Sequence, residues 1–278
     1  MAQGSDTDLA ALFAARYDDA PDGGVEGGAL IRSMAARGSC RRFAGDPVPD
    51  ALVQTLCATA LAAPSKSDLQ QRDIVLLQSP AIRARLAALV AGQAWVAEAP
   101  MIAVFCGNNR RQRMLHDWRA VPFANDHLDA FFNAACDAAI CLGAFVTAAE
   151  ALGLGCCPIS AVRNEAAAVS DLLGLPDHVF PFAGLAFGFP KAAAQITKRL
   201  PLGVTCHVDR YSEDGLRAAV DRYDADRASA QPYATQRQTD QFGHADPYTW
   251  SEDKVRQYSV PERSGFGAYV RARGFDLS

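Results

Sequence analysis

The chain has 278 residues, of which 50% are hydrophobic and 21% are charged. This composition is typical of a globular protein with a substantial core, and it excludes disordered, collagen-like and coiled-coil chains. The formal net charge of -4 gives no general basic field, which argues against nucleic acid or an anionic membrane as the main partner. We therefore expect small-molecule partners.

Residues 1–30 lack a basic start followed by an apolar run, so no secretory signal is predicted. No stretch approaches the roughly eighteen uninterrupted apolar residues that a membrane span requires. The cysteines lie mainly in apolar segments, and the adjacent Cys156 and Cys157 are poor disulfide partners, which favours a reducing, cytoplasmic location. Because no CxxC or HxxxH spacing occurs, we expect no metal site.

The first half of the chain begins with a segment that we expect to form a loosely attached arm, ending at a Gly- and Asp-rich boundary over 22–28. Apolar spacing and proline positions then predict several elements. In chain order they are a helix over 29–36, a helix over 50–62, a strand over 73–77, a helix over 80–90 and a strand over 101–106. The sequence GQAW at 92–95 predicts a surface loop or the start of another helix.

The second half is dominated by the segment 128–152, which is small, apolar and Ala-rich on nearly every face. This pattern predicts a helix that is buried all round and is a candidate for contact with a second subunit. After it we predict a strand over 156–159, a helix over 165–173 with Asn164 as its N-cap, and a strand over 180–187.

These strands and helices do not alternate strictly, and no GxGxxG follows a strand. A Rossmann domain is therefore disfavoured, and an α+β fold is predicted. The tail from residue 212 is polar and helical and is then interrupted by glycine and proline. We predict an arm over 1–28, a core over 29–211 and a C-terminal extension over 212–278.

The sequence RGSCRRF places guanidinium groups and a hydroxyl in one turn at Arg37, Ser39 and Arg41. This is suitable chemistry for binding a phosphate monoester, although a solvated basic turn has the same composition. A second basic set, Lys191, Lys198 and Arg199, lies far away in sequence. The phosphate interpretation strengthens if folding brings Arg199 to Arg37.

Two polar segments and the nucleophilic residues leave alternatives open. The loop PSKSDLQ over 64–70 is either an ordinary turn or a source of donors to a ligand, and Gln93 has an amide that suits a heterocycle edge. A cysteine-dependent hydrolase using Cys40, Cys156 or Cys157 is the weaker hypothesis, because His178 and His207 are expected to be structural. His116, His127 and His244 are expected at the surface, and no GxSxG is present.

Taken together, several ordered segments resemble the FMN-dependent nitroreductase superfamily, in particular its class A oxygen-insensitive nitroreductases and their flavin reductase relatives. The resemblance runs from about residue 30 to residue 275. The segments that carry it are RGSCRRF, PSKSDLQ, LVAGQAWVAEAPMIAVFC, AAEALGLGCCPISAVRNEAAAVSDLLGLPDHVFPFAGLAFGFP, KRLP and YTWSEDKVRQYSVPERSGFGAYVRARGF.

The resemblance implies an FMN site at a dimer interface. It implies that the FMN phosphate is bound by Arg37, Ser39, Arg41 and Arg199, with Gly38 and Lys198 in the same set. It implies that the second subunit contributes Pro64, Ser65, Lys66 and Ser67. Gln93 would contact the polar edge of the isoalloxazine ring, and the ring would be covered by Pro158, Ile159, Ser160 and Ala161. The backbone N–H of Ala161 would face flavin N5, and Arg163 and Arg263 would line the pocket for the nicotinamide nucleotide or acceptor.

The fold implied is a nitroreductase-like fold with a central, mostly antiparallel sheet flanked by helices, in an intertwined homodimer wrapped by the C-terminal extension. The activity implied is electron transfer from NADPH or NADH, through bound FMN, to nitroaromatic, quinone or similar acceptors in a ping-pong cycle. A flavin reductase that supplies reduced FMN has the same site and is an alternative. A non-catalytic flavin-binding protein is an alternative of another class.

Three positions depart from the pattern of the family. Gly38 stands where a further basic residue is usual, and Thr197 stands where a lysine would help to bind phosphate, so that Lys191 or Lys198 is the expected replacement. The sequence QFGHAD over 241–246 lacks the arginines that some relatives place on the NADPH 2′-phosphate, which leaves NADPH or NADH open as the donor. Asp68 replaces a neutral or aromatic residue and is expected to affect the choice of substrate.

Overall fold

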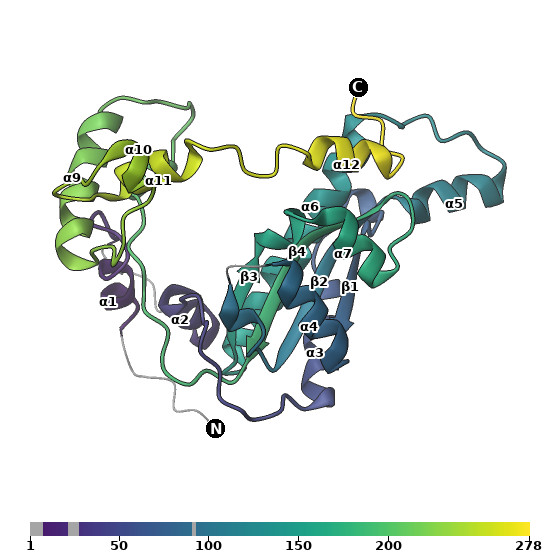
Figure 1. Cartoon of the computed structure of the whole chain (residues 1–278), viewed down its shortest axis with the longest axis horizontal. Coiled ribbons are helices and arrows are strands. Elements are labelled where there is room, and N and C mark those ends of the chain that lie inside the picture. Colours follow the sequence, from purple (N-terminus) through teal and green to yellow (C-terminus); the bar gives the residue numbers. More distant parts are fainter. Residues whose placement is uncertain (1–7, 22–27, 91–92) are drawn as a thin grey trace. The chain divides into compact units, whose positions relative to one another are not determined.

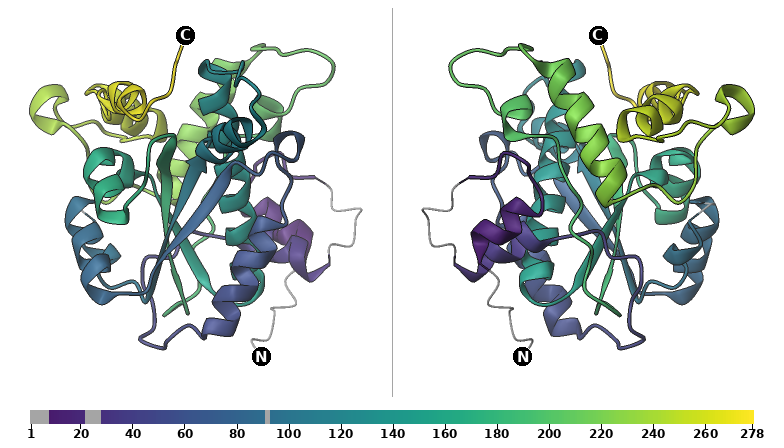
Figure 2. Two further views of the ribbon diagram at one scale, coloured as in Figure 1. Left: turned by 90° about the vertical axis from the view of Figure 1, so that its right-hand side faces the viewer. Right: turned by 90° about the vertical axis from the view of Figure 1, so that its left-hand side faces the viewer.

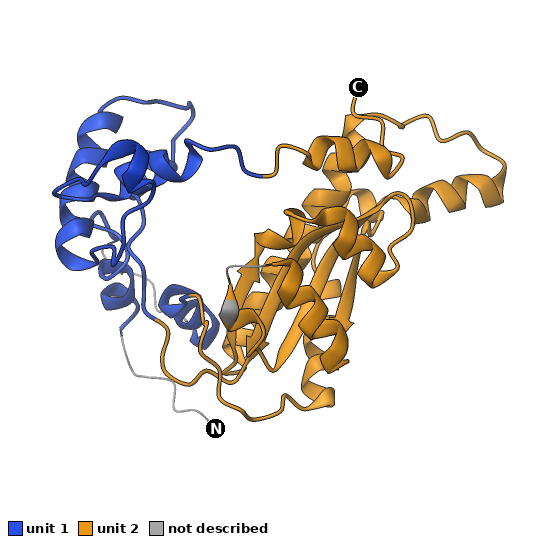
Figure 3. Ribbon diagram, viewed as in Figure 1, with its two compact units in different colours: residues 1–38, 195–262 blue, residues 39–194, 263–278 orange. Residues whose placement is uncertain are grey.

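Figure 1 shows the computed structural model of the chain, which describes residues 8–21, 28–90 and 93–278. The chain forms two compact units (Figure 3). Unit 1 comprises residues 1–38 and 195–262, and unit 2 comprises residues 39–194 and 263–278. The boundaries predicted at residues 28 and 211 stay predictions.

Unit 2 is built around an antiparallel sheet with the strand order β1-β2-β4-β3. Its strands are β1 (Arg72–Leu77), β2 (Met101–Asn108), β3 (Gly155–Ile159) and β4 (Val179–Gly188). Every predicted strand is present, and each extends the predicted range by one or two residues. The predicted α+β class with an antiparallel sheet is therefore confirmed.

Helices cover both faces of this sheet (Figure 2). On one face lie α3 (Asp50–Leu61) and α6 (Leu128–Ala151), and on the other lie α4 (Pro80–Leu89) and α7 (Ala166–Leu173). Side chains of β2 alternate between the two layers, so that Val104 packs towards α4 and α7 and Phe105 packs towards α3 and α6. Both side chains are fully buried, which explains the continuous apolar sequence of this strand.

The predicted long apolar helix is α6, and within the single chain only one of its faces is buried. Ala134, Cys141 and Phe145 are fully buried, whereas Phe132 is 60% exposed and Ile140 is 42% exposed. One face of α6 packs on the sheet, and the other is an exposed apolar surface. The helix is also long and apolar enough to cross a membrane, a weak indication that it shares with core helices of soluble proteins, and 44% of its most apolar window is buried.

Two local features of unit 2 differ from the prediction. Helix α5 (Arg110–Arg119) was not predicted, because its sequence RRQRMLHDWR has no apolar periodicity. Asn164 is not the N-cap of α7, because a short 3-10 turn, η3 (Ser160–Arg163), precedes it and Glu165 takes the N-cap position. The Asn164 side chain instead accepts a hydrogen bond from Arg263.

The described part of unit 1 is helical. Its helices are α1 (Leu9–Ala14), α2 (Ala29–Ala36), α8 (Leu202–Thr205), α9 (Leu216–Ala230), α10 (Thr239–Phe242) and α11 (Trp250–Tyr258), while α12 (Phe266–Ala272) belongs to unit 2. Helix α1, which was not predicted, lies within the predicted arm and buries Leu9 and Leu12 against α2 and Ile196. The rest of the arm, residues 1–7 and 22–27, lies outside the described residues.

Candidate functional site

The end of β3 presents the residues that sequence predicted to lie over a ligand ring. Pro158 and Ser160 are exposed, whereas Ile159 and Ala161 are buried. Ile159 pairs with Gly184 of β4, where a Cβ atom would come within 3.1 Å of the Val162 side chain, so that glycine allows η3 to turn close against β4. Because Ala161 is in the first turn of η3, its backbone N–H has no partner within that helix.

Residues 39–41, the second half of the basic cluster that begins at Arg37, are hydrogen-bonded to β3. The Cys40 backbone N–H donates to the Cys156 carbonyl oxygen at 2.9 Å. A Cβ atom at Gly155 would lie 2.6 Å from the Cβ of Cys40, so only glycine permits this close packing. The contact places the exposed residues Ser39 and Arg41 beside β3, and hence in the part of unit 2 that contains the residues at 158–161.

Gln93 and Arg41 both lie next to the short turn that contains Trp95. The Arg41 guanidinium lies 5.9 Å from the centre of the Trp95 ring, which is in the short 3-10 turn η2 (Ala94–Val96). Gln93 begins this turn, since its carbonyl oxygen accepts the Val96 backbone N–H at 2.9 Å. Unit 2 thus brings Arg41 and Gln93 to one region. Gly92 of the sequence GQAW lies outside the described residues.

Arg163 and Arg263 are close together at a small cavity of about 170 Å³, which Phe266 and Tyr269 also line. The Arg163 guanidinium donates to the Phe182 carbonyl oxygen, and burial, followed by the charge of Arg263, lowers its pKa below the ordinary value. A guanidinium that is partly desolvated beside a second positive charge favours a negatively charged ligand nearby. The structure thus brings both residues to one cavity, and their role in binding a nucleotide or acceptor stays a prediction.

The loop after α3 is held by Asp137, a functional candidate that the sequence analysis missed. The buried Asp137 carboxylate accepts the backbone N–H groups of Lys66 at 2.9 Å and of Gln71 at 2.8 Å. It also lies 3.9 Å from the buried Arg72 guanidinium. A lone aspartate inside an apolar helix was the available signal. The side chains of Lys66 and Ser67 remain exposed, as a ligand of a second subunit would require.

In unit 1, Arg16 joins the two distant basic segments. Its guanidinium donates to the carbonyl oxygens of Ala35 at 2.8 Å, of Arg37 at 2.6 Å and of Thr197 at 3.4 Å. The Arg199 backbone N–H donates in turn to the Arg16 carbonyl oxygen at 2.8 Å. One buried side chain of the arm, that of Arg16, thus connects the two segments that carry Arg37 and Arg199. No sequence motif pointed to Arg16.

Lys198, the expected replacement for a lysine at 197, is engaged elsewhere. Its ammonium group lies 2.5 Å from the carboxylate of Asp18, another residue of the arm. The neighbouring Asp19 accepts the backbone N–H groups of Leu202 and Gly203 at 2.7 and 2.8 Å. Arg199 is exposed, and within the described residues its guanidinium meets only backbone carbonyls of its own segment, at 3.4 Å or more.

The thiols do not have the character of nucleophiles. Cys40 is buried, and burial raises its pKa above the ordinary value, with a hydrogen bond to the Arg42 carbonyl opposing the shift. Cys156 and Cys157 are buried within β3. Because a reactive cysteine needs an accessible thiolate, these surroundings disfavour the cysteine-hydrolase alternative.

Comparison with known proteins places this arrangement in a family. The nitroreductase family model matches residues 34–189, and the model of the nitroreductase family C-terminal domain matches residues 198–278. The NAD(P)H FMN reductase of Bacillus subtilis is 32% identical over 200 residues, covering 70% of this chain and 80% of that protein. The oxygen-insensitive NADPH nitroreductase of Salmonella typhimurium is 31% identical over 238 residues, covering 85% and 93%.

A solved structure agrees with this result. The structure of B. megaterium NfrA2 superposes with a TM-score of 0.83 at 29% identity, covering 91% of this chain and all of that chain (100%). Helix α1 and Arg16 precede the first family match, so they are additions to the matched regions. The two family models together span most of the chain, and it belongs to the nitroreductase family.

Proposed function

We propose that this protein is an NAD(P)H-dependent FMN oxidoreductase that reduces planar, electron-poor acceptors such as nitroaromatics and quinones. The observation that carries the proposal is the attachment of Ser39 and Arg41 to β3, which also bears the residues at 158–161. Relatives named for FMN, NAD(P)H and nitroreductase activity support the same chemistry. No side-chain nucleophile is needed for it.

The residues present fit an FMN phosphate. Within the described residues, neither Arg41 nor Arg199 forms an ion pair with a carboxylate, so that both guanidinium groups are available to an anion. Arg37 and Ser39 complete the proposed phosphate set, and Gln93 is proposed to contact the polar ring edge. When bound, FMN would supply the redox-active ring for hydride and electron transfer.

The protein's contribution is placement and electrostatics. The Ala161 N–H is proposed to donate to the flavin edge, because it is a fixed donor in the first turn of η3. Arg163 and Arg263 are proposed to stabilise negative charge on a bound nucleotide or acceptor, because both residues line one cavity. If the nicotinamide nucleotide and the acceptor bind in turn at this one cavity, the kinetics are ping-pong, and double-reciprocal plots of rate at different acceptor concentrations give parallel lines.

We further propose that the protein acts as a homodimer in the cytoplasm. The exposed apolar face of α6 includes Leu128, Phe132 and Ile140, which are 49%, 60% and 42% exposed. Such a surface is typical of a subunit interface. In a dimer, the loop 64–67 of one subunit would contact the flavin of its partner.

The experiment is the visible spectrum of the purified protein, followed by anaerobic mixing with NADH and with NADPH. We expect a flavin spectrum that is bleached by at least one of the two donors. A protein that neither retains nor binds added FMN, or bound flavin that neither donor bleaches, would contradict the proposal.

A flavin reductase that releases reduced FMN is the second candidate, and a relative of that name supports it. The same residues serve both activities. Retention of FMN through gel filtration in the reduced state favours direct reduction of an acceptor, whereas release of reduced FMN favours the flavin reductase.

A further inference from the structure

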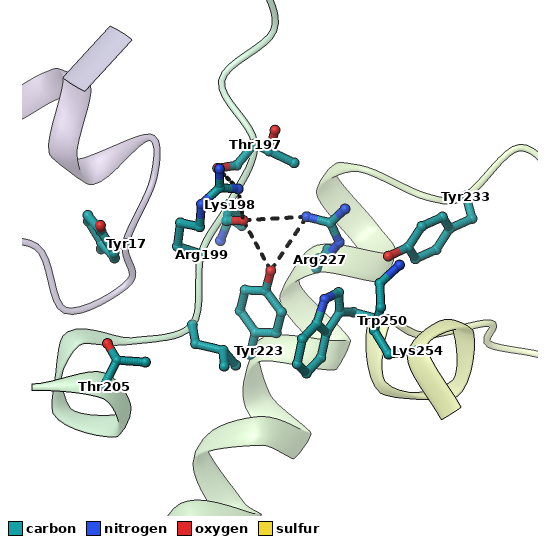
Figure 4. A pocket seen from close by; sticks show the side chains of 11 residues that line it. Tyr17, Thr197, Lys198, Arg199, Thr205, Tyr223, Arg227, Tyr233, Trp250 and Lys254 are labelled. Atoms are coloured by element: carbon teal, nitrogen blue, oxygen red, sulfur yellow. Dashed lines mark hydrogen bonds between the residues drawn. The ribbon is translucent and has the colours of Figure 1, made fainter. Parts of the chain in front are cut away.

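Unit 1 contains a cavity of about 430 Å³ at the segment 197–200, α9 and α11 (Figure 4). Sites for small molecules have this size, are mostly apolar and contain a few converging polar groups. The aromatic side chains of Tyr17, Tyr223 and Trp250 line this cavity. Four cations also line it, namely Lys198, Arg199, Arg227 and Lys254.

Two of these cations are paired with carboxylates. Lys198 lies 2.5 Å from Asp18, and Lys254 lies 2.5 Å from Asp253. Asp18 offsets the charge of Lys198, whereas Asp253 also pairs with Arg237 at 3.1 Å, so that Lys254 keeps part of its positive charge at the cavity.

The other two cations, Arg199 and Arg227, share one neutral acceptor. Both guanidinium groups approach the Lys198 carbonyl oxygen, at 3.4 and 3.5 Å. Within the described residues neither is in an ion pair with a carboxylate, and the Nε of Arg227 is buried without a hydrogen-bond partner. Two positive charges at one neutral acceptor repel each other, and an anion between them would stabilise both.

The surroundings suit an anion attached to a ring. The Tyr223 hydroxyl donates to the same Lys198 carbonyl at 3.1 Å, and the Tyr233 ring lies 5.3 Å from the Arg227 guanidinium. Aromatic walls of this kind stack on or pack against planar rings. Thr197 stands where the family pattern has a phosphate-binding lysine, and Arg227 supplies a positive charge beside that segment.

We propose that Arg199 and Arg227 together bind a phosphate monoester of a nucleotide at this cavity, with Arg227 replacing the missing lysine. The inference rests on the proposed function, because two such esters belong to that reaction. One is the 5′-phosphate of FMN, and the other is the 2′-phosphate of NADPH.

Direct binding to the flavin-free full chain tests the proposal without requiring turnover. Calorimetric titrations use FMN against riboflavin and adenosine 2′,5′-bisphosphate against adenosine 5′-monophosphate, so that each pair differs by the phosphate concerned. Arg227→Ala is expected to raise the Kd of one phosphorylated probe about tenfold or more, the loss typical of a charged hydrogen bond. Arg227→Lys is expected to lose less, because it retains the charge without the guanidinium fork.

The matched control is Arg217→Ala, which removes an 89% exposed cation from the same helix, α9, outside the cavity. It is expected to leave both Kd values unchanged. A loss confined to FMN assigns the cavity to the flavin phosphate, and a loss confined to the bisphosphate assigns it to the 2′-phosphate of NADPH.

The proposal is overturned if both Kd values for folded Arg227→Ala stay within about twofold of wild type. Thermal unfolding of each variant checks folding, and Arg227→Gln takes its place if Arg227→Ala does not fold. Failure of the proposed function is a separate result, seen as wild-type protein whose flavin neither donor bleaches although the probes bind.

Discussion

Arg163 is half-buried, and its guanidinium lies over the rings of Phe182 and Phe266. The guanidinium donates to the Phe182 carbonyl oxygen, and Arg163 lines the same cavity as Arg263. Arg163→Gln should therefore lower kcat/KM for the acceptor about 10- to 100-fold, because a fixed positive charge near developing negative charge is lost. Steady-state kinetics measures this, with FMN affinity expected to stay near that of wild type. Arg271→Gln, on the exposed part of α12, is the control and should behave like wild type.

Cys106 in β2 is fully buried, and burial raises the pKa of its thiol to about 12, with the charge of Asp73 adding to the shift. The unfolded chain ionises this thiol at its ordinary pKa, whereas the folded chain keeps it protonated. Stability is therefore lost as pH rises from about 9 towards 12. Urea midpoints should fall with pH less steeply for Cys106→Ala than for wild type. Cys206→Ala, at an exposed position, should follow wild type, and equal slopes for all three would contradict the assignment.

At the level of elements, Asp137 links α6 to the loop before β1. Asp137→Ala would remove the carboxylate that accepts from two backbone N–H groups and that lies beside the Arg72 guanidinium. The Arg72 side chain is only 4% exposed, so water cannot replace the lost partner. Breaking a buried charge pair of this kind costs about 3–5 kcal/mol. The change is measured as the free energy of unfolding in urea. Asp129→Ala on the exposed first turn of α6 should cost less than about 1 kcal/mol, and an equal loss at both sites would argue against a special role of Asp137.

In the arm, Arg16 connects the segments that carry Arg37 and Arg199. Arg16→Ala removes hydrogen bonds to the carbonyls of Ala35, Arg37 and Thr197, so Arg37 and Arg199 lose the side chain that ties their segments together. We expect the Kd for FMN, from quenching of flavin fluorescence, to rise about tenfold. Arg222→Ala, an exposed cation of α9, is the control. A lowered melting temperature with an unchanged Kd would mean that Arg16 supports the fold alone.

At the level of the whole molecule, the exposed apolar face of α6 is the surface on which the proposed dimer depends. Phe132→Asp places a charge on this face and should convert a dimer into monomers, as measured by light scattering after gel filtration. FMN binding should weaken with it, because the loop 64–67 of the partner would be lost. Val255→Asp, at a 68% exposed position of α11, should leave the mass unchanged. A wild-type monomer would contradict the dimer directly.

The sequence by itself determined the four strands and most helices of the core, because burial imposes local apolar spacing and proline and glycine mark the ends of elements. The family followed from the resemblance of ordered sequence segments, and the family models agree with it. Helix α5 escaped prediction, since a charged helix carries no such spacing. Only the tertiary structure revealed the contacts of Arg16, Asp137 and Arg227. Each of these side chains meets backbone groups of segments far away in sequence, and such pairings leave no local pattern from which they can be inferred.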